Sequence, residues 1–132
     1  MKPLRRLLLA ATLAVLPAAA LAHAPPVGPN GGMQTHAGPY HQEVVVKDGE
    51  MRVFLYTDED APIPTDGATG FATVLAEGRT ERVELKPAGG NTLTGSGGFT
   101  AKAGTKIVTS VTLAGKGPVQ ARYEVKAGHA GH

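Results

Sequence analysis

The sequence predicts an all-β protein whose folded part is a small immunoglobulin-like antiparallel β-sandwich of about seven strands. Short runs of β-branched and alternating apolar residues recur between residues 40 and 126, and clusters of Gly, Asn and Asp separate them. No segment after residue 22 carries the apolar period of 3.6 residues that marks an amphipathic helix. About seven short strands at this spacing are typical of a sandwich, and a small barrel is the alternative.

The clearest local signal is a hairpin around Asp48-Gly49. Residues 41–47 have consecutive valines at their centre, and residues 50–57 alternate apolar and polar side chains. An Asp-Gly pair between two such runs favours a type I′ turn, because both central residues of that turn need a positive φ. The acidic stretch 58–67 lacks the ligand spacing of a calcium loop and is expected to be a solvated turn. Further strands are expected over residues 70–77, 80–86, 92–94, 106–113 and 119–125.

The N-terminus has the features of a secretory signal peptide. Basic residues precede an apolar run over residues 7–16, and Ala20-Leu21-Ala22 fits the small-residue pattern of a cleavage site. The apolar run is too short to span a bilayer, so we expect no stable membrane insertion after cleavage. The expected location is the periplasm or the outside of the cell. The expected organisation is a signal peptide over 1–22, a His/Pro/Gly-rich irregular arm over 23–39, the sandwich domain over 40–126 and a His/Gly tail over 127–132.

Composition excludes several function classes. Without residues 1–22 the chain has 10 basic and 11 acidic side chains and no long basic block, so nucleic acid is not an expected partner. Cysteine is absent, which excludes disulfides and thiolate ligands. No phosphate loop, hydrolase elbow or marked carboxylate pair is present, so we expect no enzymatic activity. The sequence does not specify an oligomeric state.

The most informative chemical feature is the position of the five histidines, none of which lies between residues 42 and 128. If cleavage follows Ala22, His23 becomes the first residue, and its free amine and imidazole can chelate one metal together. If cleavage follows Ala20, His23 becomes the third residue, where it can join the amine and two backbone amides in a square nitrogen site. Either arrangement suits Cu(II).

His36 and His41 are the next candidate ligands, with Met33 just upstream. Imidazole suits copper and zinc, and a thioether favours Cu(I). Each histidine on its own is equally compatible with a plain surface residue, and the spacing matches no closed zinc pattern. The C-terminal His129 and His132 form a short His/Gly tract that is expected to be a bystander or a weak secondary site.

The arm and the strand after it resemble a group of small exported bacterial proteins. The similarity rests on the His/Pro/Gly-Gly arm from His23, on Ala37-Gly38-Pro39-Tyr40-His41-x-Glu43, and on Lys86 to Leu93. Similar His-Gly-Gly segments occur in periplasmic adaptor subunits of heavy-metal efflux systems. The resemblance implies a periplasmic binding module linked to metal handling, with His23, His36 and His41 as the motif positions.

These observations lead to an expected function and two alternatives. The expected function is a non-enzymatic periplasmic metal-binding protein that holds copper, or else zinc, cobalt or nickel, and buffers it or passes it to an efflux adaptor. The expected ligands are His23, His36, His41 and Met33. The first alternative is a metal-free immunoglobulin-like interaction module. The second, an oxidative copper enzyme with an N-terminal histidine, would need a broad substrate face that six aromatic residues hardly supply.

Overall fold

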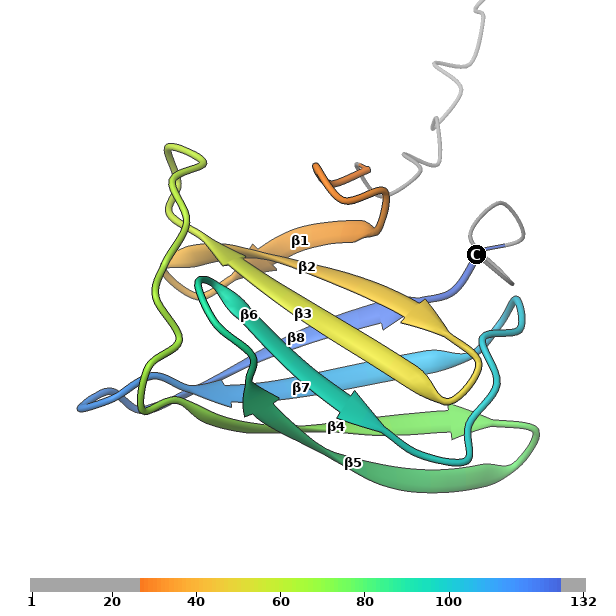
Figure 1. The fold of residues 1–132 in the computed structure, drawn as a ribbon. Coiled ribbons are helices and arrows are strands. Elements are labelled where there is room, and N and C mark those ends of the chain that lie inside the picture. The colour runs from red at the N-terminus through yellow and green to blue at the C-terminus, as the bar shows by residue number, and fades with distance from the viewer. Residues whose placement is uncertain (1–26, 127–132) are drawn as a thin grey trace, which may run out of the picture.

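The computed structural model describes residues 27–126, in which the chain forms eight β-strands and no helix (Figure 1). The predicted signal peptide, His23 and the tail histidines lie outside the described residues. No described segment forms a helix of the length and apolarity that a bilayer crossing requires. The strands are β1 (Met33–Ala37), β2 (Tyr40–Lys47), β3 (Glu50–Tyr56), β4 (Thr69–Ala76), β5 (Arg79–Pro87), β6 (Thr92–Ser96), β7 (Lys106–Thr112) and β8 (Pro118–Glu124).

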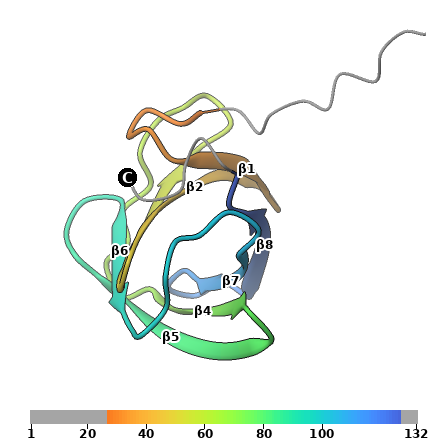
Figure 2. The same ribbon diagram turned by 90° about the vertical axis from the view of Figure 1, so that its right-hand side faces the viewer.

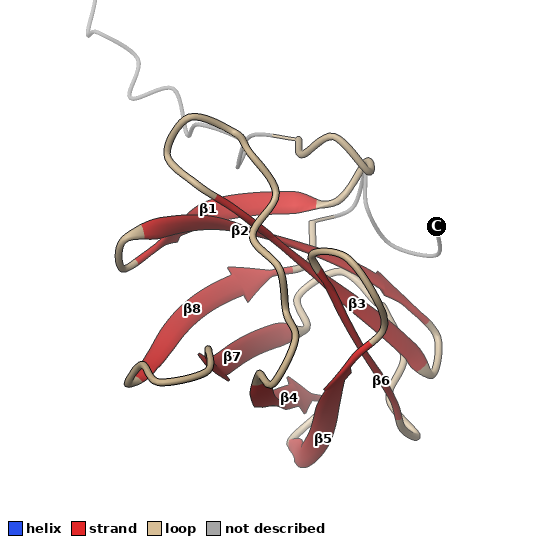
Figure 3. Ribbon diagram, turned by 60° about the vertical axis from the view of Figure 1, so that its left-hand side comes forward, coloured by secondary structure: helices blue, strands red, loops and turns tan. Residues whose placement is uncertain are grey.

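All neighbouring strands are antiparallel, in the order β1-β2-β3-β6-β5-β4-β7-β8. Strand β5 joins two layers, because most of its length pairs with β4 whereas Lys86 and Pro87 pair with β6. Gly95 of β6 lets the two strands approach closely, since a Cβ there would lie 2.4 Å from the carbonyl oxygen of Glu84. The view in Figure 2 shows the sheet curling until β1 and β8, its two edges, come close together. The fold is therefore an antiparallel sandwich that approaches a barrel (Figure 3).

The all-β antiparallel prediction is confirmed, and the predicted strands correspond to β2 through β8. The additional strand, β1, lies inside the arm that the sequence predicts to be irregular. Pro and Gly residues on both sides obscure the β-strand pattern of its five residues in the sequence. These residues form a strand because they pair with β2. A two-residue turn joins them, with Gly38 at φ 56° and Pro39 after it. This matches a type II′ hairpin turn, which needs a positive φ only at its first central residue.

The β2–β3 hairpin is present where Asp48-Gly49 predicts it, but its turn is not type I′. Gly49 has φ 75°, whereas Asp48 does not have a positive φ. The amide of Gly49 donates to the carbonyl oxygen of Phe99, and the Gly49 carbonyl accepts from Gly97. The turn is therefore shaped by its pairing with the loop after β6, a long-range contact that the local sequence does not encode.

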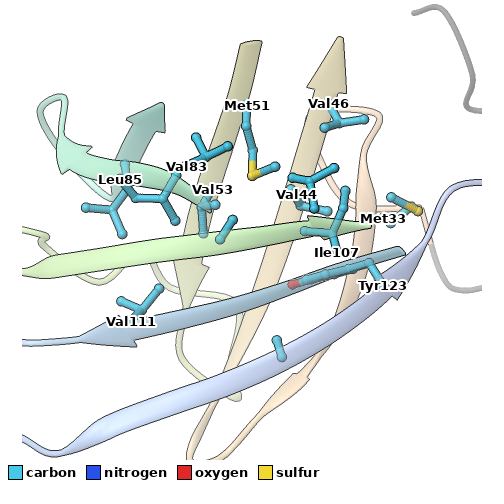
Figure 4. Packing of buried hydrophobic residues seen from close by; sticks show 14 of the residues in the cluster. Met33, Val44, Val46, Met51, Val53, Val83, Leu85, Ile107, Val111 and Tyr123 are labelled. Carbon is cyan, nitrogen blue, oxygen red and sulfur yellow. The ribbon is translucent and has the colours of Figure 1, made fainter. Parts of the chain in front are cut away.

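Apolar side chains from both layers fill the interior (Figure 4). Val44 and Val53 from one layer are fully buried, as are Ile107 and Val111 from the other. Burying a side chain of this size contributes roughly 1.5–3 kcal/mol relative to exposure. Alternation along the strands sends one set of residues into this core and the next set to the outer face. Because of this alternation, only candidate ligands on the same face of the sheet can lie close enough to bind one ion.

A small polar cluster lies within the apolar interior. The Tyr123 hydroxyl donates to the backbone carbonyl of Gln42 at 3.0 Å, and the Thr109 hydroxyl donates to the Gln42 side-chain oxygen. Burial, with a smaller contribution from the charge of Glu43, raises the pKa of Tyr123 far above its ordinary value of 10.0. Burial also raises the pKa of Tyr40.

The buried tyrosines predict a loss of stability in alkali. The unfolded chain ionises its tyrosines above about pH 10, whereas the folded state holds Tyr123 neutral, so stability that is complete below this pH falls as the pH rises. Urea unfolding at neutral and alkaline pH should show this loss, and Tyr123→Phe should reduce the slope. Tyr123→Phe should also be about 1 kcal/mol less stable at neutral pH, because a buried hydrogen bond is lost. An unchanged pH slope in the variant would contradict the assignment to Tyr123.

Candidate metal centre

Two of the predicted ligands, His36 and His41, are direct cross-strand partners in the β1–β2 hairpin. Their ring centroids are 4.4 Å apart with the planes at 83°. Both belong to the set of residues that alternation directs to the outer face, away from the buried Ala37 and Tyr40. His36 is exposed, and the side chain of His41 is 20 % exposed. The short turn between them fixes this register, so the sequence brings the two imidazoles together by local pairing alone.

Two carboxylates from the loop after β3 face His41. Asp58 Oδ1 lies 3.6 Å from Nε2 of His41, and Asp60 Oδ1 lies 3.5 Å from Nδ1. These distances are ion-pair distances and are longer than hydrogen bonds. The donor atoms of His36, His41 and Asp58 all lie within 4.8 Å of one another.

The loop that carries the carboxylates is held by its own backbone. The Thr57 amide donates to the Ala61 carbonyl at 2.7 Å, and the Asp60 amide donates to the Thr57 carbonyl at 2.9 Å. The Thr57 hydroxyl accepts from the amides of Glu59 and Ala61. Asp60 has φ 65°, a left-handed conformation that is uncommon outside Gly, Asn and Asp. The turn therefore presents both carboxylates to the same imidazole.

Tyr56 and Asn30 lie beside the histidine pair on the same outer face of the sheet. Tyr56 pairs with His41 across β2 and β3, and its hydroxyl accepts from the Asn30 side-chain amide at 2.9 Å. The same amide donates to Glu43 Oε1 at 2.9 Å, while the backbone amides of Asn30 and Gly32 donate to Glu43 Oε2 at 2.9 and 2.8 Å. Glu43 is fully buried beneath this segment. The segment before β1 is thus fixed beside the histidine pair.

Met33 does not join the histidines. It is 2 % exposed and packs in the core, because it belongs to the inward-facing set of β1 whereas His36 belongs to the outward-facing set. The expectation of a thioether ligand overlooked this alternation, since the arm was not predicted to contain a strand. The described candidate site therefore offers imidazole nitrogen and carboxylate oxygen.

Asp58 and Asp60 are the residues that sequence reasoning missed, because an acidic turn without calcium spacing is usually only solvated. The register of the β2–β3 hairpin could have predicted that these two residues lie near His41. A two-residue turn at Asp48-Gly49 pairs residue 41 with residue 56, so the residues just after 56 must lie beside the start of β2. Comparison of the chain with protein-family models, curated proteins and solved structures finds no match. The chemistry of this site must therefore be inferred from its own residues.

Proposed function

We propose that the protein is a non-enzymatic, exported metal-binding protein whose described ligands are His36, His41 and Asp58. The observation that supports this most strongly is the direct pairing of two imidazoles beside a carboxylate. Bonds of about 2.0–2.1 Å place neighbouring donor atoms roughly 2.8 Å apart in a square-planar Cu(II) site and roughly 3.3 Å apart in a tetrahedral Zn(II) site. Modest rotation of the exposed side chains of His36 and Asp58 would close the 4.8 Å arrangement to such distances.

Asp60 would orient the metal-binding ring. With Nε2 of His41 on the metal, Nδ1–H would donate to the carboxylate of Asp60. A carboxylate partner of this kind fixes the ring orientation and increases the basicity of the ligating nitrogen. His23, which lies outside the described residues, remains the proposed additional ligand through its imidazole and the amine that signal cleavage would expose.

The donor set favours Cu(II) over zinc, cobalt and nickel. Affinity for nitrogen and oxygen sites rises through cobalt and nickel to Cu(II) and falls again at zinc. With Met33 in the core, the described site lacks the soft ligand that would favour Cu(I). The side chains of Asp58 and Asp60 are 70 % and 75 % exposed, which leaves the site open to ligand exchange. An open site suits buffering in the periplasm or transfer to a heavy-metal efflux adaptor.

Calorimetric titration of the chelator-treated, signal-free protein tests the proposal. We expect one equivalent of Cu(II) to bind with a Kd below micromolar, and Zn(II) to bind more weakly at the same site. Binding no tighter than micromolar for both ions would contradict the proposal. The contacts of His41 with Asp58 and Asp60 would then be a plain surface ion-pair cluster.

A substitution at Asp58 tests whether its carboxylate is a metal ligand. Asp58→Asn should weaken Cu(II) binding about tenfold, because it replaces a charged oxygen ligand by a neutral amide. Asp66→Asn is the matched control, since Asp66 is an exposed aspartate of the same connection between β3 and β4 but outside the cluster. Equal Kd values for the two variants would remove Asp58 from the ligand set.

A further inference from the structure

An apolar pocket of about 540 Å³ lies at one end of the curled sheet. The β1–β2 turn, the end of β3 with the loop after it, and the β7–β8 turn meet there. Its volume falls within the range of small-molecule sites, and the mouths of β-barrels are a usual place for them. The side chains that define its chemistry are Tyr40, Ile63, Leu113, Lys116, Pro118 and Val119.

One charged side chain interrupts this apolar lining. Lys116 is exposed and forms no salt bridge within residues 27–126. Among the described residues that line the pocket, Lys116 is the one charged side chain.

We propose that this pocket binds an apolar monocarboxylate, with the hydrocarbon against Ile63, Leu113 and Val119 and the carboxylate towards Lys116. The apolar lining excludes strongly hydrated polar guests, and the unopposed cation selects an anion over a neutral molecule. The pocket and the metal site lie on opposite faces of the sheet, and Thr57, which holds the turn of Asp58 and Asp60, also lines the pocket. Tyr40 and His41 are consecutive residues of β2 and therefore point to opposite faces of the sheet.

Octanoate is the test ligand, used with the chelator-treated, signal-free protein so that metal binding plays no part. Two-dimensional amide NMR should show saturable shifts centred on Gly117, Val119 and the β1–β2 turn. Lys116→Gln should weaken octanoate binding about threefold to fivefold, as expected for an exposed ion pair. Lys86→Gln is the matched control, because Lys86 is an exposed lysine of β5 that does not line the pocket.

Octanol tests the contribution of the carboxylate without any change to the protein. Octanol should bind more weakly than octanoate and should not respond to Lys116→Gln.

Four results would overturn the proposal. One is the absence of saturable binding at millimolar octanoate, and another is shifts centred away from the β7–β8 turn. The third is equal octanoate affinity in Lys116→Gln and Lys86→Gln. The fourth is octanol binding as tightly as octanoate, which would indicate a neutral apolar guest. Loss of Cu(II) binding in the histidine variants would leave the octanoate result unchanged, so the two proposals fail separately.

Discussion

Replacing His36 and His41 together by alanine is expected to weaken Cu(II) binding by at least about 100-fold. Each substitution removes an imidazole ligand, and the remaining carboxylates are poorer ligands for Cu(II) than nitrogen. The two rings lie on the outer face, and neither contributes to the buried core, so the fold should survive. Calorimetric titration of the double variant against the parent protein measures the change.

Two controls separate this site from other histidines. His129→Ala with His132→Ala alters the same number of imidazoles in the tail and should leave the Kd within about twofold, as expected for a terminal bystander. Single variants should each lose affinity, since the paired rings act on one ion. If the double variant at positions 36 and 41 bound Cu(II) within about threefold of the parent, the ion would be held elsewhere, with His23 the first residue to test.

Replacing Glu43 by alanine is expected to lower the free energy of unfolding by about 3 kcal/mol. The substitution removes a fully buried carboxylate that accepts three hydrogen bonds from Asn30 and Gly32. Hydrogen bonds to a charged group contribute about 1.5–3 kcal/mol, and the buried amide of Gly32 loses its partner. The backbone of Gly28 packs directly against the Glu43 side chain, since a Cβ at Gly28 would lie 2.3 Å from the carboxyl carbon of Glu43.

Urea unfolding of the metal-free protein measures this effect. Glu84→Ala is the matched control, since Glu84 is an exposed residue of β5 whose ion pair with Arg82 is also exposed. It should change stability by less than about 0.5 kcal/mol. A Glu43→Ala variant as stable as Glu84→Ala would mean that the segment before β1 is not anchored by this carboxylate.

The fold class followed from local patterns because most of the strands are bounded by turn residues that act locally. Asp48-Gly49 located the first predicted hairpin, and alternation located the strands on both sides of it. What local patterns could not show is β1, whose five residues form a strand only because β2 offers them a partner. The same is true of the β2–β3 turn, whose shape depends on the distant loop around Phe99.

The sequence alone predicted the two histidines of the candidate site but not its two aspartates. The spacing of His36 and His41 around Gly38-Pro39 becomes a cross-strand pair once the turn is recognised, so these two residues are encoded locally. Asp58 and Asp60 required the register of the next hairpin. The prediction of Met33 as a ligand was wrong, because successive residues of a strand point to opposite faces of the sheet. Met33 is close to His36 in sequence but points into the core.

In the proposed metal centre, the rings of His36 and His41 hold the same ion. Paramagnetic broadening of the histidine ring resonances by substoichiometric Cu(II) tests this in the signal-free protein. The ring signals of His36 and His41 should disappear together and first, with the signals of His129 and His132 persisting. Broadening that begins at the tail, or that removes only one of the paired rings, would contradict a shared metal centre.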